Sequence, residues 1–212
     1  MTARLVLATL IAAVALSLSR SPARSFQFIG AIWPDDALPV PYCVNPANMP
    51  VNSDGSPILS ANGFAAMVQN AFQTWQSVPS TYMAFSFQGF CDASPRDSYD
   101  GINTIGFAAL DGTAGGATSP LFTHTAILKD GKFKQMIAAD VIVDTRFAEI
   151  YDADYYTQVM LPHIILHEAG HFLGLEHSND GCSVMIASGL NPTPTSLCED
   201  DIAAVSILYP RN

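Results

Sequence analysis

Residues 167–177 read HEAGHFLGLEH, and this stretch decides how the rest of the chain must be organised. We expect a helix over Ile164–Leu173, with Pro162 in its first turn, where no amide donor is needed. His167 and His171 are four residues apart, so both imidazoles project from one face of that helix. Two imidazoles in this arrangement can bind one metal ion, at about 2.0–2.1 Å each.

Gly174 stands where the helix must end, because glycine adopts the left-handed conformation that reverses the chain. The reversal can bring His177 back as a third ligand. Three histidines leave the fourth tetrahedral position open to water, which is typical of a catalytic rather than a structural zinc site. Glu168 follows the first ligand, and we expect it to be the general base for a metal-activated water.

The extended pattern is unlike a chance HExxH in a helix. It fixes five positions, so a random chain of this length would contain it on the order of once in 10⁵. The segment resembles the zinc signature of the metzincin metallopeptidases. Ser178, directly after the third histidine, is similar to the matrixin branch. Residues 182–185 (Cys-Ser-Val-Met) resemble the family's Met turn, which implies that Met185 forms an apolar floor beneath the metal without binding it.

The resemblance extends more loosely over most of residues 33–209. Trp33-Pro34 with Pro39–Val44 resembles the first strand of a matrixin, residues 71–75 its first helix and residues 197–209 its C-terminal helix. The resemblance implies the α+β class and a metzincin-like zincin fold. In that fold a mixed twisted sheet packs against two helices, and the active-site helix is followed by the Met turn and a C-terminal helix.

The pattern of apolar and turn residues predicts the same class independently. It favours a helix from Ser60 to about Val78 and a last helix that starts after Ser196, with Ser196 and Glu199 as a capping box. Lys129-Asp130-Gly131-Lys132 is a hairpin signal. The predicted strands are Pro39–Val44, Tyr82–Phe87, Ile102–Ala108, Thr123–Leu128 and Phe133–Asp144.

Residues 1–25 have the pattern of a secretory signal peptide: Arg4, an apolar run to about Leu18, and small residues before position 26. The alternative is an uncleaved N-terminal anchor, although the run is shorter than the roughly 20 residues of a membrane span. Residues 26–212 would then form one matrixin-like catalytic domain, secreted, monomeric and free of the membrane.

The composition restricts the partners. The chain has 212 residues, 49% hydrophobic and 13% charged, which suits one compact domain. Without residues 1–25 it carries 6 basic and 19 acidic residues, a net charge of −13. Such an acidic chain repels nucleic acid and anionic membranes, so we expect no nucleic-acid partner.

Four cysteines follow the signal segment, and an even number in an exported chain argues for two disulfides. Three pairings are open, and free thiols are the alternative. We favour Cys43–Cys91 and Cys182–Cys198, because the second bond would bracket Met185 and the loop that follows it. Closing a loop of that size is typically worth about 2–4 kcal/mol.

Three features common among matrixins are missing or weak. We expect no latency propeptide between the signal segment and Trp33, and no structural zinc, since the other histidines, His124 and His163, lack the required pattern. We expect His163 to lie away from the metal. Calcium is common in the family, and four acids could supply oxygen ligands, although solvated loop acids are the favoured interpretation: Asp140, Asp144, Asp152 and Asp154.

The family likeness implies a polypeptide substrate in a cleft between an edge strand and the loop after the Met turn. Gly115–Thr118 is the candidate edge strand, with a plain loop as the alternative, and Ile186–Leu197 should wall the pocket beside the zinc. The leading hypothesis is a secreted zinc endopeptidase. The competing ones are a catalytically silent, zinc-stabilised binding domain, against which intact Glu168 argues, and a zinc hydrolase of small amides.

Overall fold

The computed structural model describes residues 25–187 and 194–211. The predicted signal peptide lies outside the described residues except for Ser25, as does the middle of the segment Ile186–Leu197. Across the described ranges, no helix has both the length and the apolar character needed to cross a membrane.

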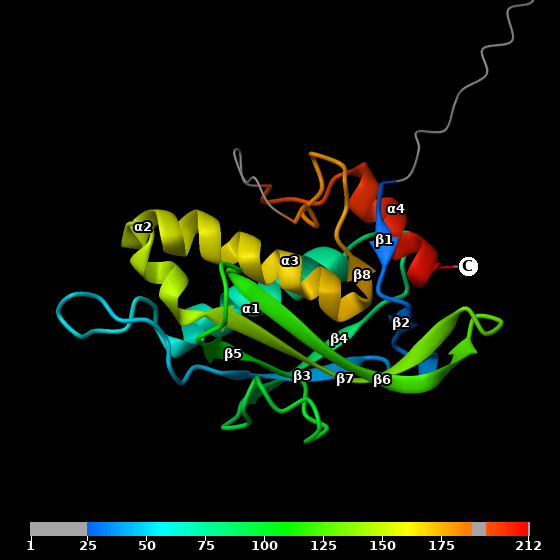
Figure 1. Cartoon of the computed structure of the whole chain (residues 1–212), viewed down its shortest axis with the longest axis horizontal. Coiled ribbons are helices and arrows are strands. Elements are labelled where there is room, and N and C mark those ends of the chain that lie inside the picture. The colour runs from blue at the N-terminus through cyan, green and yellow to red at the C-terminus, as the bar shows by residue number, and fades with distance from the viewer. Residues whose placement is uncertain (1–24, 188–193, 212) are drawn as a thin grey trace, which may run out of the picture.

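A six-stranded mixed sheet forms one layer of the molecule (Figure 1). Its strands are β2 (Ala31–Ile32), β3 (Val40–Asn45), β4 (Phe85–Phe90), β5 (Thr104–Ala108), β6 (Gly116–Leu128) and β7 (Phe133–Asp144). The order is β2-β7-β5-β3-β4, all in parallel pairs, and β6 is added to β7 antiparallel. Among the described residues β6 pairs with β7 alone, so it is an edge strand.

The inner strands are apolar because both of their faces are covered. Residues 138–143 of β7 are all buried, and Ile105 and Phe107 of β5 are buried beside them. A mixed sheet with an α+β element order was predicted from the sequence, and the structure has it.

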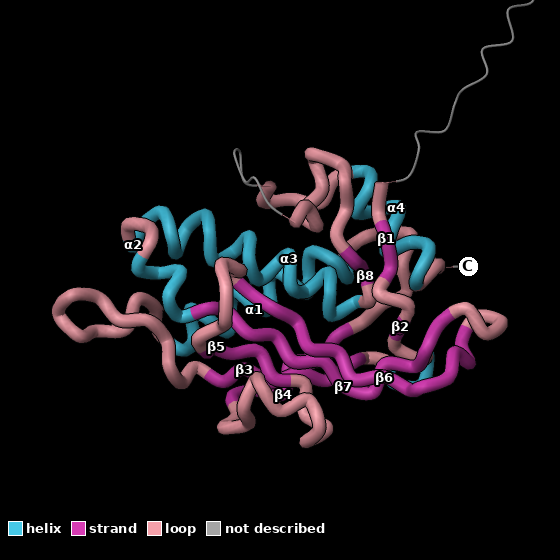
Figure 2. The backbone as a smooth tube through the Cα atoms, viewed as in Figure 1, coloured by secondary structure: helices cyan, strands magenta, loops and turns pink. Residues whose placement is uncertain are grey.

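Two long helices lie on one face of the sheet, α1 (Ala61–Gln76) and α3 (Leu161–Leu173) (Figures 1 and 2). Ser60, from which the helix was expected to start, caps α1 by accepting a hydrogen bond from the amide of Gly63 at 3.0 Å. The indole of Trp75 donates to the carbonyl of Leu166 at 3.0 Å and ties α1 to α3. The helix that carries the site residues is therefore fixed to a buried partner helix.

Several predicted boundaries are wrong; the strand expected at Thr123–Leu128, for example, begins at Gly116 as part of β6. The strand expected at Tyr82–Phe87 is β4, at Phe85–Phe90, because the amide of Tyr82 donates to the carbonyl of Tyr209 instead of joining the sheet. The last helix, α4 (Glu199–Leu208), has Cys198 as its N-cap rather than Ser196. The Asp201 carboxylate accepts from the Cys198 amide at 2.9 Å, so Asp201 replaces Glu199 in the capping role.

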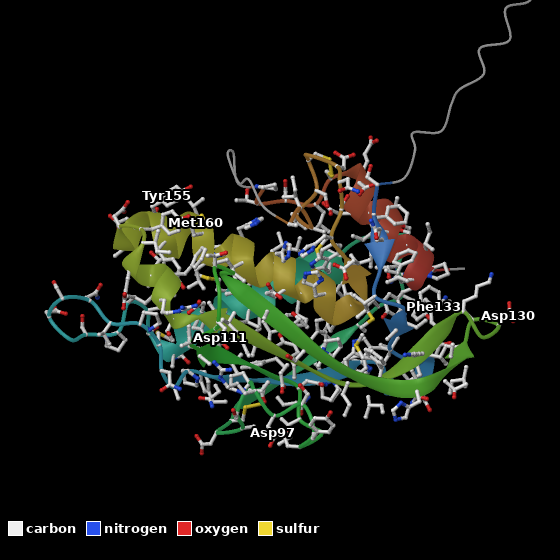
Figure 3. All side chains as sticks on the ribbon, viewed as in Figure 1. Asp97, Asp111, Asp130, Phe133, Tyr155 and Met160 are labelled. Atoms are coloured by element: carbon white, nitrogen blue, oxygen red, sulfur yellow. A yellow bond between two sulfur atoms is a disulfide. The ribbon has the colours of Figure 1, made fainter. Side chains whose placement is uncertain are left out.

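Short elements link the long ones. β1 (Gln27–Phe28) and β8 (Leu175–Glu176) form a two-stranded antiparallel ribbon. The remaining elements are η1 (Asp35–Ala37), η2 (Thr145–Glu149), α2 (Ala153–Tyr155) and η3 (Tyr156–Met160). The predicted hairpin joins β6 to β7: Lys129, Asp130 and Gly131 all have left-handed backbones, and Figure 3 shows Asp130 at its tip.

The two disulfides pair the cysteines as favoured from the sequence. Cys43–Cys91 joins β3 to the residue after β4, and Cys182–Cys198 joins the turn around Met185 to the start of α4. Among the described residues no cysteine is free.

The interpretation of the four aspartates as solvated loop acids is wrong for two of them. Asp140 and Asp144 lie on β7 and are 0% and 1% exposed. Asp144 is ion-paired with Arg146 at 2.6 Å. Asp152 caps α2 by accepting from the Tyr155 amide, and Asp154 lies exposed in that helix. Three of the four side chains, those of Asp140, Asp144 and Asp152, are thus held by hydrogen bonds or an ion pair in their local structure.

Candidate metal centre and catalytic cleft

Three histidines converge on one point. His167 and His171 lie one turn apart on α3, and His177 follows β8 after the chain has reversed. Their ligand nitrogens all lie within 4.8 Å of one another. In the part of the chain that the structure describes, this is the one group of three or more ligating side chains that is close enough to hold a metal ion.

Gly174 makes the reversal possible. It ends α3 with φ of 103°, and its amide donates to the carbonyl of His171 at 2.9 Å. A Cβ at this position would also collide with the carbonyl oxygen of Ala31. The carbonyl of Gly174 in turn accepts from the amide of Ile29 at 3.0 Å, so the N-terminal segment holds the turn in place.

Backbone carbonyls orient two of the imidazoles. Nδ1 of His167 lies 2.7 Å from the carbonyl of Val184, and Nδ1 of His171 lies 2.8 Å from the carbonyl of Leu175. A carbonyl can only accept, so each Nδ1 carries the hydrogen and each Nε2 is left with its lone pair. The two rings are therefore presented to the common centre as neutral nitrogen ligands.

Burial keeps these histidines uncharged. It lowers the pKa of His167 to about 3, with a smaller contribution from His171 nearby, and it also lowers the pKa of His171. Neutral imidazole is the form that binds metal. Three imidazole nitrogens around one point match the donor set of a zinc site with an open fourth position.

Glu168 lies beside this centre and is almost completely buried, with 4% of its surface exposed. Burial raises the pKa of Glu168 to about 7, and a hydrogen bond from Thr118 opposes that shift. A carboxyl group with a pKa near neutrality can both accept and release a proton. The geometry therefore brings a proton acceptor next to the three histidines.

Met185 lies under α3 and is 2% exposed. A Cβ at Gly170 would overlap the Met185 sulfur. Met185 can therefore pack against α3 only because residue 170 has no side chain. The carbonyl of Met185 accepts from the amide of Ser178 at 2.9 Å. This contact joins the turn around Met185 to the residue after His177.

Asp201 holds the same turn from the other side, and the sequence patterns did not identify it. Its buried carboxylate accepts from the Ser183 hydroxyl and from the amide of Val184 at 3.1 Å. Val184 is the residue whose carbonyl orients His167. The available signal was an acid in the first turn of a helix, which is common wherever helices begin.

His163 is buried on α3 one turn before His167, but it does not belong to the group of three. Its Nδ1 lies 2.6 Å from the carbonyl of Pro194, on the segment beyond the turn around Met185. His163 also lines the groove into which the three histidines open.

The histidines open into a groove of about 820 Å³. Residues 113–118 line one side of it, at the free edge of β6, while Ile186 and Ala187 line the other. Phe147, Tyr151 and Ile164 add an apolar end. The candidate edge strand at Gly115–Thr118 is thus a strand from Gly116 onward, and it lies beside the site.

Comparisons with known proteins identify the family. The matrixin family model matches residues 51–210, most of the chain. A protein described as a probable matrix metalloproteinase 095L, from Invertebrate iridescent virus 3, is 41% identical over 78 residues, which are 35% of this chain and 21% of that relative. The chain therefore spans about a fifth of the length of this curated relative.

A solved structure, the GM1 bound form of the ECX AB5 holotoxin, has a TM-score of 0.49 and 13% sequence identity. That match covers 88% of this chain and 89% of the other, and it is too distant to bear on function. The chain belongs to the matrixin family.

Proposed function

We propose that this protein is a secreted endopeptidase in which His167, His171 and His177 hold one zinc ion and Glu168 is the general base. The observation that carries the proposal is the convergence of three imidazole nitrogens within 4.8 Å, next to a buried carboxyl group. Zinc, when bound, supplies a Lewis acid that activates water and polarises a substrate carbonyl.

The residues of the chain divide the remaining work. Glu168 takes a proton from the attacking water and can return it to the leaving amine, since burial places its pKa at about 7. The carbonyls of Val184 and Leu175 keep His167 and His171 in the tautomer that binds metal. Met185 packs beneath the helix and supports the two histidines from below.

The substrate that best fits the groove is an extended polypeptide. β6 pairs with β7 on one side only among the described residues, so its other edge offers backbone groups to a peptide strand. A Cβ at Gly115 would meet Ile164 and one at Gly116 would meet Glu168, so these glycines let the edge of β6 lie close to the helix that carries the histidines. Two disulfides and the predicted signal at residues 1–25 support an exported catalytic domain at 26–212.

Cleavage of an unfolded protein tests the proposal. We expect casein to be degraded by the protein loaded with zinc, and the activity to be lost with a chelator and restored by zinc. Glu168→Ala should retain zinc and lose at least 100-fold in turnover, in line with the effect of general base catalysis, about 10²–10⁴-fold.

His177→Ala should lose both zinc and activity, whereas His124→Ala, which changes an exposed histidine on β6, should lose neither. Casein left intact by the zinc-loaded wild type would refute the endopeptidase. Cleavage of a small amide but not casein would favour the small-amide hydrolase, and zinc binding without any turnover would favour the silent binding domain.

A further inference from the structure

Thr118 is hydrogen-bonded to Glu168 across 50 residues of sequence. Its hydroxyl oxygen lies 2.7 Å from Oε2 of the Glu168 carboxylate and 3.0 Å from the backbone carbonyl of the same residue. The Thr118 hydroxyl on β6 thus contacts both the side-chain carboxylate and the backbone carbonyl of Glu168 on α3. Neither the spacing of the histidines nor the turn after them indicates this contact.

The neighbouring residue of β6 leaves the space that brings the two groups together. A Cβ at Gly116 would lie 2.8 Å from both Cγ and Oε1 of Glu168. The Glu168 side chain therefore fits between the bare backbone of Gly116 and the hydroxyl of Thr118. A carboxylate held on one side by packing and on the other by a hydrogen bond has few alternative rotamers.

We propose that Thr118 is a positioning residue for the reaction, one that holds the Glu168 carboxylate beside the group of three histidines. The inference rests on the proposed role of Glu168 as general base. Thr118 acts through Glu168 and need not touch the substrate with its side chain.

A hydroxyl group suits this role because it can donate to both forms of the carboxyl group. While Glu168 is a carboxylate, Thr118 donates to Oε2. When the other carboxyl oxygen holds the proton taken from water, Oε2 still accepts from the same hydroxyl. The contact is thus kept until the proton passes on to the leaving amine, and no proton is gained or lost by Thr118.

The position of Thr118 on the edge strand adds a second consequence. The strand whose free edge would bind the substrate backbone is the same strand that holds the base, since Thr118 pairs with Val141 on its other side. The peptide and the carboxylate are therefore aligned by one element. Loss of the hydroxyl should lower the rate of the chemical step more than it lowers peptide binding.

Three variants test this. Thr118→Val removes the hydroxyl with little change of shape, Thr118→Ser keeps it, and Thr125→Val makes the same change at an exposed position on β6. We expect Thr118→Val to lose about tenfold in kcat with KM within a factor of two, in line with the loss of a hydrogen bond to a charged group. Thr118→Ser and Thr125→Val should stay within twofold of the wild type, and all should bind one zinc.

A second measurement does not depend on activity. The chain has four glutamates, Glu149, Glu168, Glu176 and Glu199, so the ¹³Cδ resonances of glutamate-labelled, zinc-free protein are few, and Glu168→Gln identifies the one that matters. We expect the Glu168 signal to shift and broaden in Thr118→Val and to keep its wild-type position in Thr118→Ser. If Thr118→Val does not fold, Thr118→Ala removes the same hydroxyl without added bulk.

The outcomes separate the two proposals. An unmoved Glu168 signal in Thr118→Val overturns the contact, whatever the enzyme does. A moved signal with unchanged kcat, or a Thr118→Ser variant as slow as Thr118→Val, overturns the positioning role. A wild type without zinc-dependent proteolysis refutes the proposed function and removes the catalytic role of Thr118 with it, while the resonance still decides the contact.

Discussion

At the scale of single residues, a buried ionisable side chain can make the stability of the fold depend on pH. Asp140 is an example away from the cleft: its carboxyl group is fully buried in the sheet, and Oδ1 accepts from the amide of Thr104 at 2.8 Å. Burial is the main cause that raises the pKa of Asp140 to about 6, and the negative charges of Asp97 and Asp100 add to it. The folded protein therefore holds this proton more tightly than the unfolded chain does.

The pH dependence of stability follows from that difference. With a pKa near 4 when unfolded and about 6 when folded, Asp140 stabilises the fold below pH 4, and this contribution is lost as pH rises to 6. The loss amounts to at most about 3 kcal/mol. Urea unfolding at several pH values should show that Asp140→Asn, which can still accept from the Thr104 amide, is more stable than the wild type at pH 7. If the free energy of unfolding changed with the same slope between pH 4 and 6 in the wild type and in Asp140→Asn, this prediction would be contradicted.

Gly174 acts at the same scale. Gly174→Ala must place a Cβ on a left-handed backbone and against the Ala31 carbonyl, so the turn that carries His177 has to move. We expect the melting temperature to fall and zinc affinity to drop by more than tenfold, measured by competition with a chelating dye. Gly181→Ala is the control, because a Cβ there meets nothing within 4 Å, and it should change neither quantity.

At the scale of elements, the turn that contains Met185 links α4 to α3. The turn that contains Met185 is connected to α4 through the Cys182–Cys198 disulfide and the Asp201 carboxylate, and to His167 through the carbonyl of Val184. The orientation of His167 thus depends on a helix that contributes no residue to the group of three histidines.

The two disulfides allow this dependence to be measured. Cys182→Ser with Cys198→Ser, and Cys43→Ser with Cys91→Ser, should each reduce the free energy of unfolding by about 2–4 kcal/mol. Only the first pair should also weaken zinc binding, because only that bond restrains the turn beneath the site. Equal losses of zinc affinity in the two double variants would show that the effect is one of general stability.

For the whole molecule, the sequence predicts what depends on spacing along the chain and misses what depends on contacts across it. The convergence of three histidines was foreseeable because four residues make one helical turn and glycine can reverse the chain. The contacts of Thr118 and Asp201 join elements that are 50 and 17 residues apart, and no periodicity encodes them. The strand expected from Tyr82 starts late for the same reason, since the amide of Tyr82 donates to the carbonyl of Tyr209, just after α4.

The close approach of β6 to α3 also bears on how proteins with this arrangement can diverge. Gly115 and Gly116 leave no room for a side chain between the strand and the helix, so substitutions there displace Ile164 or Glu168. Ile186 and Ala187 line the same groove from the segment that follows the turn around Met185. Inherited or designed changes in peptide preference should therefore accumulate in the segment that contains Ile186 and Ala187. The edge of β6 at Gly115 and Gly116 should stay nearly invariant.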